Sequence, residues 1–180
     1  MPTINDPNGT PARVNHENRL KGEAVCTSEG SHYSQHEREL YSWLISDNTS
    51  GAEYVLAIRN DDPVKHLCFQ TIRCSSDVDS IWTGSFGTWS TVGGGTPVVA
   101  YNARADAGKA ALATAYMTAT NIAELRPLLK SYAAADKEVV FRPDGKVVLG
   151  YYDVFYIHNS AASTASLTAM IWGFYKELDR

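Results

Sequence analysis

The sequence has little surplus charge and no long hydrophobic run. Its 180 residues contain no stretch of about 18 consecutive apolar residues, so no membrane-spanning helix is expected. Sixteen basic and 20 acidic residues give a formal net charge of −4 without a basic stripe, which argues against direct nucleic-acid binding. The N-terminus lacks the basic and apolar regions of a secretory signal, and none is expected.

Cysteine is scarce, and its odd count excludes a complete set of disulfides. The three cysteines are Cys26, Cys68 and Cys74. Cys68 and Cys74 are expected on one strand, facing the same way, where a rise of about 3.3 Å per residue separates them by about 20 Å. A disulfide does not span that distance. Three mostly buried thiols are the favoured interpretation, and the alternative is that Cys26 pairs with another subunit.

Motifs with the spacing needed for catalysis are also missing. His32 and His36 would share one face of a helix and could bind a metal. Tyr33 stands where the zinc-protease motif needs glutamate, so surface histidines are favoured. His66 and Cys68 would lie about 7 Å apart on a strand, too far for direct activation of the thiol. The sequence therefore predicts no enzyme activity and no cofactor.

Two further stretches that could carry chemistry have simpler explanations. Acidic residues lie mainly in expected turns and near the N-terminus, which does not suit hydrolysis by paired carboxylates. Asp153 is the exception, and we expect it to be paired or to lie at a strand end. The glycines of Val92–Pro97 lack the spacing of a phosphate-binding loop, so this stretch is predicted as a flexible hairpin tip.

The chain is organised around two strand-like runs near its C-terminus. Tyr151–His158 and Leu167–Tyr175 are rich in aromatic and β-branched residues and carry almost no charge. Such runs are typical of central strands with both faces covered. They predict the core of a two-sheet β-sandwich.

Short strands separated by turn signals recur through the rest of the chain, which is typical of an antiparallel sandwich or barrel. A bulge or bend is expected at Gly84 or Gly87, and Arg142–Gly145 is expected to join two strands as a hairpin. Eight or nine strands are predicted in all. Besides the C-terminal pair they cover Leu40–Ile45, Glu53–Arg59, Lys65–Cys74, Ile81–Ser90, Val98–Tyr101, Val139–Phe141 and Lys146–Leu149.

The segment from about 103 to 132 is ambiguous. Alanines give Ala110–Met117 helix propensity, but its apolar residues form no clean stripe. It is predicted either as a short helix or as part of a long insertion that crosses one end of the sandwich. Pro127 places any strand over Leu125–Leu129 at a sheet edge.

Residues 1–38 are polar and contain few apolar side chains. They hold too little hydrophobic surface to fold alone. We predict an extended arm that is either disordered or laid across a partner, followed by a sandwich domain over residues 39–180. The partner-binding residues of the arm are expected to be Val14, Asn15, His16, Glu17, Asn18, Arg19, Leu20 and Lys21.

The order of motifs resembles a known group of proteins. A polar arm at Val14–Leu20 precedes a strand at Tyr41–Ile45, the strand Val55–Asn60 with an Asp-Asp-Pro turn, the stretch Pro97–Asn102 and a C-terminal apolar strand. This order resembles a loose group of tailed-bacteriophage virion proteins with an "EN-R-L" arm and a "VLYIKN"-like strand. The resemblance covers about residues 14–102 and 138–176, and the alanine-rich 103–132 segment departs from it.

The resemblance implies a structural protein of a phage particle with a jelly-roll-like sandwich. It is most similar to capsid decoration, or cement, proteins on the head exterior. The implied partners are the major capsid protein or other virion proteins and further copies of this chain, with a trimer expected. Neither nucleic acid nor membrane is an implied partner. The implied location is the outside of the virion, after synthesis in the host cytoplasm.

Two alternatives remain open. The same fold could serve as a tail, collar or baseplate component. A carbohydrate-binding module is the alternative from another class, with Trp82, Trp89 and Tyr101 as an aromatic platform for sugars.

Overall fold

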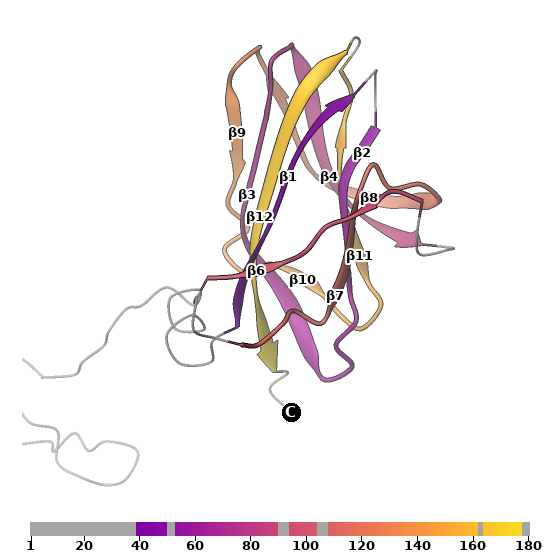
Figure 1. Cartoon of the computed structure of the whole chain (residues 1–180), viewed down its shortest axis with the longest axis vertical. Helices are drawn as coiled ribbons and strands as arrows, with labels where there is room; N and C mark the ends of the chain where they lie inside the picture. The colour runs from indigo at the N-terminus through magenta and orange to yellow at the C-terminus, as the bar shows by residue number, and fades with distance from the viewer. Residues whose placement is uncertain (1–38, 50–52, 90–93, 104–107, 162–163, 178–180) are drawn as a thin grey trace, which may run out of the picture.

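The computed structural model describes residues 39–49, 53–89, 94–103, 108–161 and 164–177. These residues form strands and connections without a helix, and the strands make two antiparallel sheets, consistent with a β-sandwich (Figure 1). The all-β prediction is therefore confirmed. The predicted arm lies outside the described residues, together with Cys26, His32 and His36.

Each sheet has six strands. Sheet I has the order β10-β3-β12-β1-β6, with β9 also paired to β3, and sheet II has the order β5-β7-β2-β11-β4-β8. Sheet I comprises β1 (Leu40–Thr49), β3 (Lys65–Ser76), β6 (Tyr101–Asn102), β9 (Glu138–Phe141), β10 (Val147–Leu149) and β12 (Ala165–Glu177). Sheet II comprises β2 (Glu53–Asn60), β4 (Ser80–Trp89), β5 (Thr96–Pro97), β7 (Ala113–Met117), β8 (Ile122–Ala133) and β11 (Val154–Asn159).

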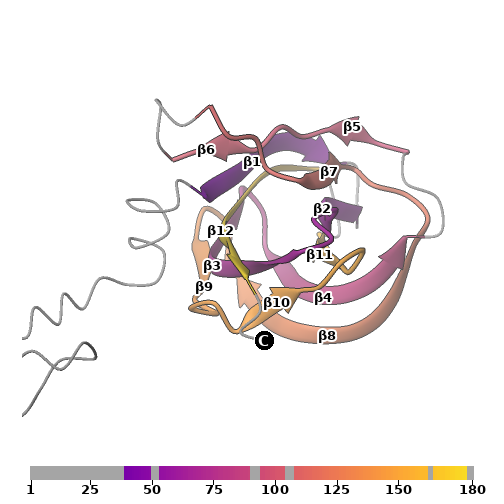
Figure 2. The ribbon, with the colours of Figure 1, turned by 90° about the horizontal axis from the view of Figure 1, so that it is seen from below.

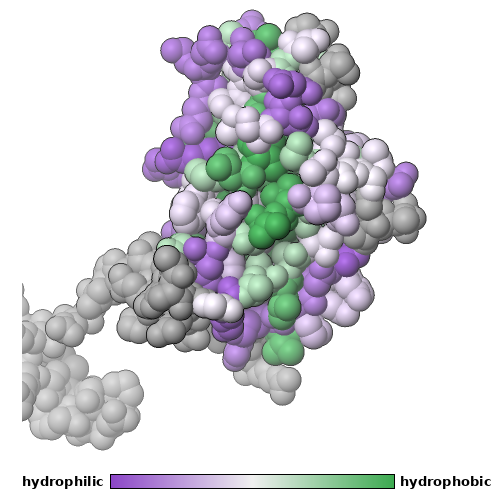
Figure 3. All heavy atoms as spheres, viewed as in Figure 1, coloured by the Kyte–Doolittle hydropathy of each residue, from purple (hydrophilic) through white to green (hydrophobic). Residues whose placement is uncertain are grey.

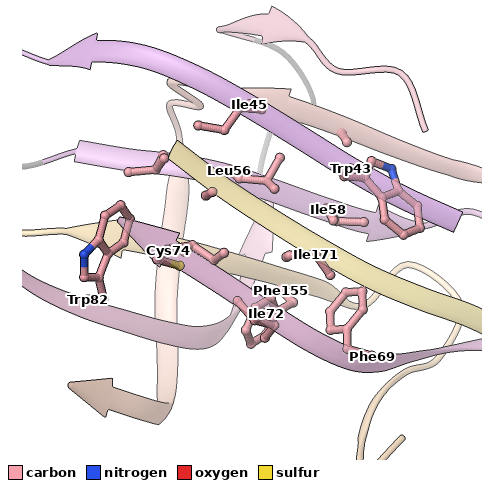
Figure 4. Close-up of a cluster of buried hydrophobic side chains, with 14 of the residues drawn as sticks. Trp43, Ile45, Leu56, Ile58, Phe69, Ile72, Cys74, Trp82, Phe155 and Ile171 are labelled. Carbon is pink, nitrogen blue, oxygen red and sulfur yellow. The ribbon is translucent and has the colours of Figure 1, made fainter. Parts of the chain in front are cut away.

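The core lies between the two sheets. Figure 4 shows side chains from both sheets pointing toward one another, with Trp43 and Phe69 from sheet I and Trp82 and Phe155 from sheet II. All four are fully buried. Gly84 is required here, because a Cβ on it would lie 2.8 Å from Cζ of Phe155.

The two C-terminal runs fold as strands but do not pair with each other. β11 lies in the middle of sheet II and β12 in the middle of sheet I, so the chain crosses the core between them. Nearly every residue of β11 is buried, as expected. On the outer face of β12, Ser166 and Thr168 are exposed and Trp172 is half-buried, whereas Gly173, Phe174 and Tyr175 are all buried. The prediction of two covered faces is therefore wrong for the first part of β12 and holds only at its end.

A β-bulge in β3 reverses the expected orientation of its cysteines. Opposite β12, Phe69 pairs with Gly173 and Thr71 with Trp172, which leaves Gln70 as an extra residue. Side chains after this bulge change faces. Cys74 therefore lies in the core, while Cys68 packs with Leu40 and Phe174 in a separate cluster. The prediction that the two thiols face the same way is wrong, although both are buried.

The predicted hairpin around residues 142–145 is a single interrupted edge strand. β9 and β10 both pair antiparallel with β3, one after the other. The turn between them stays beside β3, because the amide of Gly145 donates to the carbonyl of Phe69 at 2.8 Å. The glycine stretch before β5 is not a hairpin tip either, since β4 and β5 are not neighbours in sheet II.

The ambiguous 103–132 segment forms strands rather than a helix. Thr114 to Met117 pair with β2, so alanine propensity gives way to the hydrogen bonds of the sheet. β8 is the last strand of sheet II, as Pro127 predicted. Its pairing with β4 shifts between Gly84 and Ser85 and between Phe86 and Gly87, where irregularity was expected. The extra residues, Leu125 and Leu128, are on β8, and both are exposed.

One side of the structure is closed by a segment that joins both sheets. Residues 96–102, here called the crossing segment, begin in β5 beside β7 of sheet II and end in β6 beside β1 of sheet I. Figure 2 shows this segment running across the two sheets from β5 to β6. Val98 and Ala100 pack against the core beneath it.

Candidate functional site

The predicted partner-binding residues Val14 to Lys21 lie outside the described residues. The described part of the chain begins at Glu39, directly before β1. The site that can be built from the structure is therefore the place where the N-terminal 38 residues join the sheets. We call it the arm root and define it as Glu39, Tyr41, Lys65 and Lys109.

Glu39 is a buried carboxylate held by two lysines. It is only 3% exposed, and the ammonium of Lys65 donates to its two carboxylate oxygens at 2.8 and 2.9 Å. Lys109 also binds Oε1 of Glu39. A buried charge is tolerated when it is paired and hydrogen-bonded in this way. These two ion pairs join the start of β1 to the start of β3 and to the chain before β7.

The electrostatics of the arm root follow from this pair. Desolvation lowers the pKa of Lys65, but the hydrogen bond and negative charge of Glu39 outweigh it, and the pKa is raised overall. Burial and the charge of Glu39 raise the pKa of Tyr41 to about 12, while a hydrogen bond to Asn102 opposes that rise. Near neutral pH the ammonium of Lys65 is therefore charged and the phenol of Tyr41 is protonated.

Backbone hydrogen bonds reinforce the arm root. The amide of Ala103 donates to the carbonyl of Leu40 at 2.8 Å, and the amide of Tyr175 donates to the carbonyl of Glu39 at 3.4 Å. The hydroxyl of Tyr41 donates to the carbonyl of Ala110 at 3.3 Å. The first described residues are thus fixed on both sides, by β12 and by the end of the crossing segment.

Apolar side chains lie exposed near the arm root. Leu44 points outward from β1 and is 52% exposed, and Val99 and Tyr101 are exposed on the crossing segment. Figure 3 shows hydrophobic side chains gathered in a band over this face, which carries β1, β12 and the crossing segment. Exposed apolar groups that gather on one face are typical of an interaction surface.

Three kinds of reactive group can be followed in the described residues. No three His, Cys, Asp or Glu side chains there come together to hold a metal ion. Burial raises the pKa of the Cys74 thiol, and the nearby charge of Glu138 adds to the rise, so the thiol stays protonated. Asp153 lies just before β11, as expected of a residue at a strand end, and its Oδ2 accepts the amide of Gly150 at 2.8 Å. The described part of the chain also contains no helix that could span a membrane.

The predicted aromatic platform does not exist. Trp82 is fully buried in the core. Trp89 packs edge-on against Tyr116 of sheet II, with ring centroids 5.5 Å apart. Tyr101 is exposed on β6 of sheet I. Because one ring is inside and the other two lie on different sheets, these side chains do not present one surface to a sugar.

Glu39 was missed as a functional residue, because the sequence places it among alternating charges. Its lysine partners are 26 and 70 residues away along the chain. Local pattern cannot pair groups at such separations. Only the fold identifies Glu39 as the buried anchor of the arm root.

The fold and the arm root define an all-β protein with two antiparallel sheets and a buried, paired carboxylate directly before its first strand. Comparisons with known proteins add no closer identity. No protein-family model, curated protein or solved structure matches this chain.

Proposed function

We propose that this chain is a structural protein of a tailed-bacteriophage particle, a decoration protein that stabilises the capsid from outside the head. The observation that carries the proposal is the arm root. A 38-residue polar extension starts from a buried, doubly paired Glu39 next to an exposed apolar face. Such an anchor ties an attached arm to β3 of sheet I and to the chain that leads into β7.

The strand order supports the proposal of a jelly roll. Setting aside β5, β6 and β7, and taking β9 and β10 as one strand, sheet I has the order β10-β3-β12-β1 and sheet II the order β8-β4-β11-β2. Two interlocked Greek keys produce this order. Consecutive strands alternate between the sheets except for β4 and β8, which are neighbours in sheet II. Jelly rolls of this kind are common in viral capsid proteins.

The partners follow from the same proposal. Residues Val14 to Lys21 of the arm bind the major capsid protein or another virion protein. The exposed face with Leu44 and Val99 contacts a further copy of the chain, and a trimer is the proposed oligomer. The site needs no catalytic group and no cofactor for this role.

Two truncations test the role of the arm. Removal of residues 1–38 is expected to leave a folded protein, because the described strands contain the whole core, but to abolish binding to particles assembled without it. Removal of residues 1–12 alone keeps Val14 to Lys21 and is the matched control, with binding unchanged. Co-sedimentation with particles measures attachment, and far-UV circular dichroism with thermal unfolding checks the fold. Normal attachment without residues 1–38 would refute the proposed role of the arm.

A second experiment separates the head from other locations. Mass spectrometry of purified heads and tails is expected to find the chain in the head fraction. Detection in tails alone would reassign it as a tail, collar or baseplate component with the same fold. Analytical ultracentrifugation of the pure chain tests the trimer.

A further inference from the structure

A groove lies on the side of the structure opposite the crossing segment. Its volume is about 510 Å³, and it opens between the end of β4, the first half of β8 and the turn before β11. This volume falls within the range of about 300–1,000 Å³ typical of small-molecule sites. Its lining includes Phe86, Thr88, Leu125, Arg126, Tyr152 and Asp153.

The rim of this groove is built on a buried asparagine. Asn60 is 0% exposed. Its carbonyl accepts the amide of Tyr152 at 2.8 Å, and its own amide donates to the carbonyl of Asp153 at 3.1 Å. Its side-chain Nδ2 donates to the carbonyl of Leu149 at 3.0 Å. The turn that carries Tyr152 is therefore held by the end of β2 and does not depend on its own sequence alone.

Tyr152 occupies a backbone conformation that aromatic residues avoid. Its φ angle is +66°, a left-handed conformation that is an outlier for bulky side chains. The ring stacks on Tyr151 with centroids 3.9 Å apart, and Cζ of Arg59 lies 4.9 Å from its centre. Even so, Tyr152 stays 57% exposed. The fold thus holds a strained aromatic residue rigidly at the rim, where core packing does not need it.

Two opposite charges face this groove without neutralising each other. Arg126 and Asp153 both line it, but no ion pair between them occurs in the part of the chain that the structure describes. Among those residues the Arg126 side chain also has no hydrogen bond, although the backbone of Arg126 pairs with Phe86. One carboxylate oxygen of Asp153 accepts the amide of Gly150. The groove therefore offers unused donors from a guanidinium and an acceptor from a carboxylate.

The floor of the groove is apolar. Phe86, Val148 and Val154 contribute hydrocarbon surface between the polar groups. A sugar ring matches this pattern, because it has apolar C–H faces and a rim of hydroxyls that both donate and accept hydrogen bonds. We propose that the groove binds a short saccharide of two or three sugar units. Arg126 and Asp153 hydrogen-bond its hydroxyls, and the part of the Tyr152 side chain that Tyr151 and Arg59 leave exposed contacts a sugar unit.

A peptide added as an extra strand fits this groove less well. The edge strand β8 contains Pro127, which has no N–H to donate, and it carries extra residues at Leu125 and Leu128. These interruptions break the regular spacing that a β-ladder requires. The open edge of β8 therefore favours a ligand that binds through side chains, as a saccharide does.

Titration of the full-length chain with chitotriose, cellotriose and maltotriose tests the proposal. Saturation-transfer NMR detects contact, and isothermal titration gives the affinity. At least one of the three is expected to bind with a Kd of about 1 mM or tighter. Tyr152→Gly and Arg126→Ala are each expected to weaken that binding at least about tenfold, the loss of roughly 1.4 kcal/mol.

The variants include their own controls. Glycine adopts a φ of +66° without strain, so Tyr152→Gly removes the ring while keeping the turn. Lys130→Ala and Tyr132→Ala remove a cation and an exposed tyrosine from the same strand outside the groove, and should bind the saccharide as the parent chain does. Thermal unfolding confirms that all four variants fold.

Three outcomes would overturn the proposal. The first is that none of the three saccharides binds at a saccharide concentration tenfold above the expected Kd of about 1 mM. The second is that binding survives in both Tyr152→Gly and Arg126→Ala. The third is that a synthetic peptide of residues 10–25 changes the chemical shifts of Arg126 and Tyr152, which would place it in the groove, while the saccharides do not bind.

Discussion

The two sides of this structure, where the edges of the sheets face each other, differ in how they are covered. On one side the crossing segment hydrogen-bonds to β7 of sheet II and to β1 of sheet I, and Val98 and Ala100 fill the space beneath it. On the other side β8 and β10 are the last strands of their sheets, and a groove remains between them.

The difference shows what closes a two-sheet structure. Packing between the sheets buries the centre, but each sheet ends in unpaired backbone groups. On the closed side the crossing segment pairs with strands of both sheets. The closed side also carries the arm root, so the attachment that we propose would share its contacts with closure. The open side leaves polar groups accessible, which suits recognition of a small ligand.

The largest expected effect is loss of a core aromatic beside the closed side. Trp43 on β1 is fully buried, so Trp43→Ala should lower the free energy of unfolding by about 3–5 kcal/mol through the cavity it leaves. Trp172→Ala is the matched control. Trp172 is half-buried on the outer face of β12, and its loss should cost about 1–2 kcal/mol. Equal losses in urea unfolding would show that the outer face is covered as tightly as the core.

The next effect tests the open side. Asn60→Ala removes the donor to the carbonyls of Leu149 and Lys65 and the acceptor for the amide of Asp62. Buried groups left without partners should cost about 3 kcal/mol in total. Urea unfolding measures the loss, and Asn48→Ala, at an exposed position, should change stability by less than about 0.5 kcal/mol. A loss of less than about 0.5 kcal/mol in Asn60→Ala would mean that the groove rim is stable without the Asn60 side chain.

A third change addresses the ion pair at the arm root. Glu39→Gln leaves Lys65 and Lys109 without a carboxylate, and a loss of about 2 kcal/mol is expected at neutral pH. The cost is moderate because the Lys109 side chain is 51% exposed and regains water.

The pH dependence of this variant has a definite sign. The pKa of Lys65 is raised in the folded protein, so its contribution to stability is complete below the ordinary lysine pKa of about 10.4. That contribution is lost as the pH rises through the higher folded value. Thermal unfolding between pH 9 and 12, taken as roughly the window around these values, should show a steeper fall for the parent chain than for Glu39→Gln. Parallel curves would mean that the pair does not control alkaline stability.

The smallest effect compares neighbours on the crossing segment. Val98 packs against the core, whereas Val99 is 69% exposed. Val98→Thr buries a hydroxyl and should cost about 1–2 kcal/mol, while Val99→Thr should change stability by less than about 0.5 kcal/mol. Equal, small effects in urea unfolding would show that the segment lies on the surface without closing that side.

Part of the site could be predicted from the sequence, and part could not. The edge position of β8 followed from Pro127 alone, because proline cannot donate in the interior of a sheet. Glu39 and Asn60 gave no such signal, since their partners lie far along the chain. The platform of Trp82, Trp89 and Tyr101 was wrong, because aromatic composition does not tell which face of which sheet a ring will occupy.

What the sequence by itself determined is the all-β class and the strands outside residues 96–133, whereas β7 and β8 were left ambiguous. Local runs of β-branched and aromatic residues with turn residues between them place β1, β2, β3 and β11 close to their observed bounds. Tertiary structure decided which strands pair, how the bulge in β3 reverses its faces, and why residues 138–149 form one edge strand instead of a hairpin. The physical reason is that pairing and closure depend on contacts between residues far apart in the chain, and no local pattern encodes the partner.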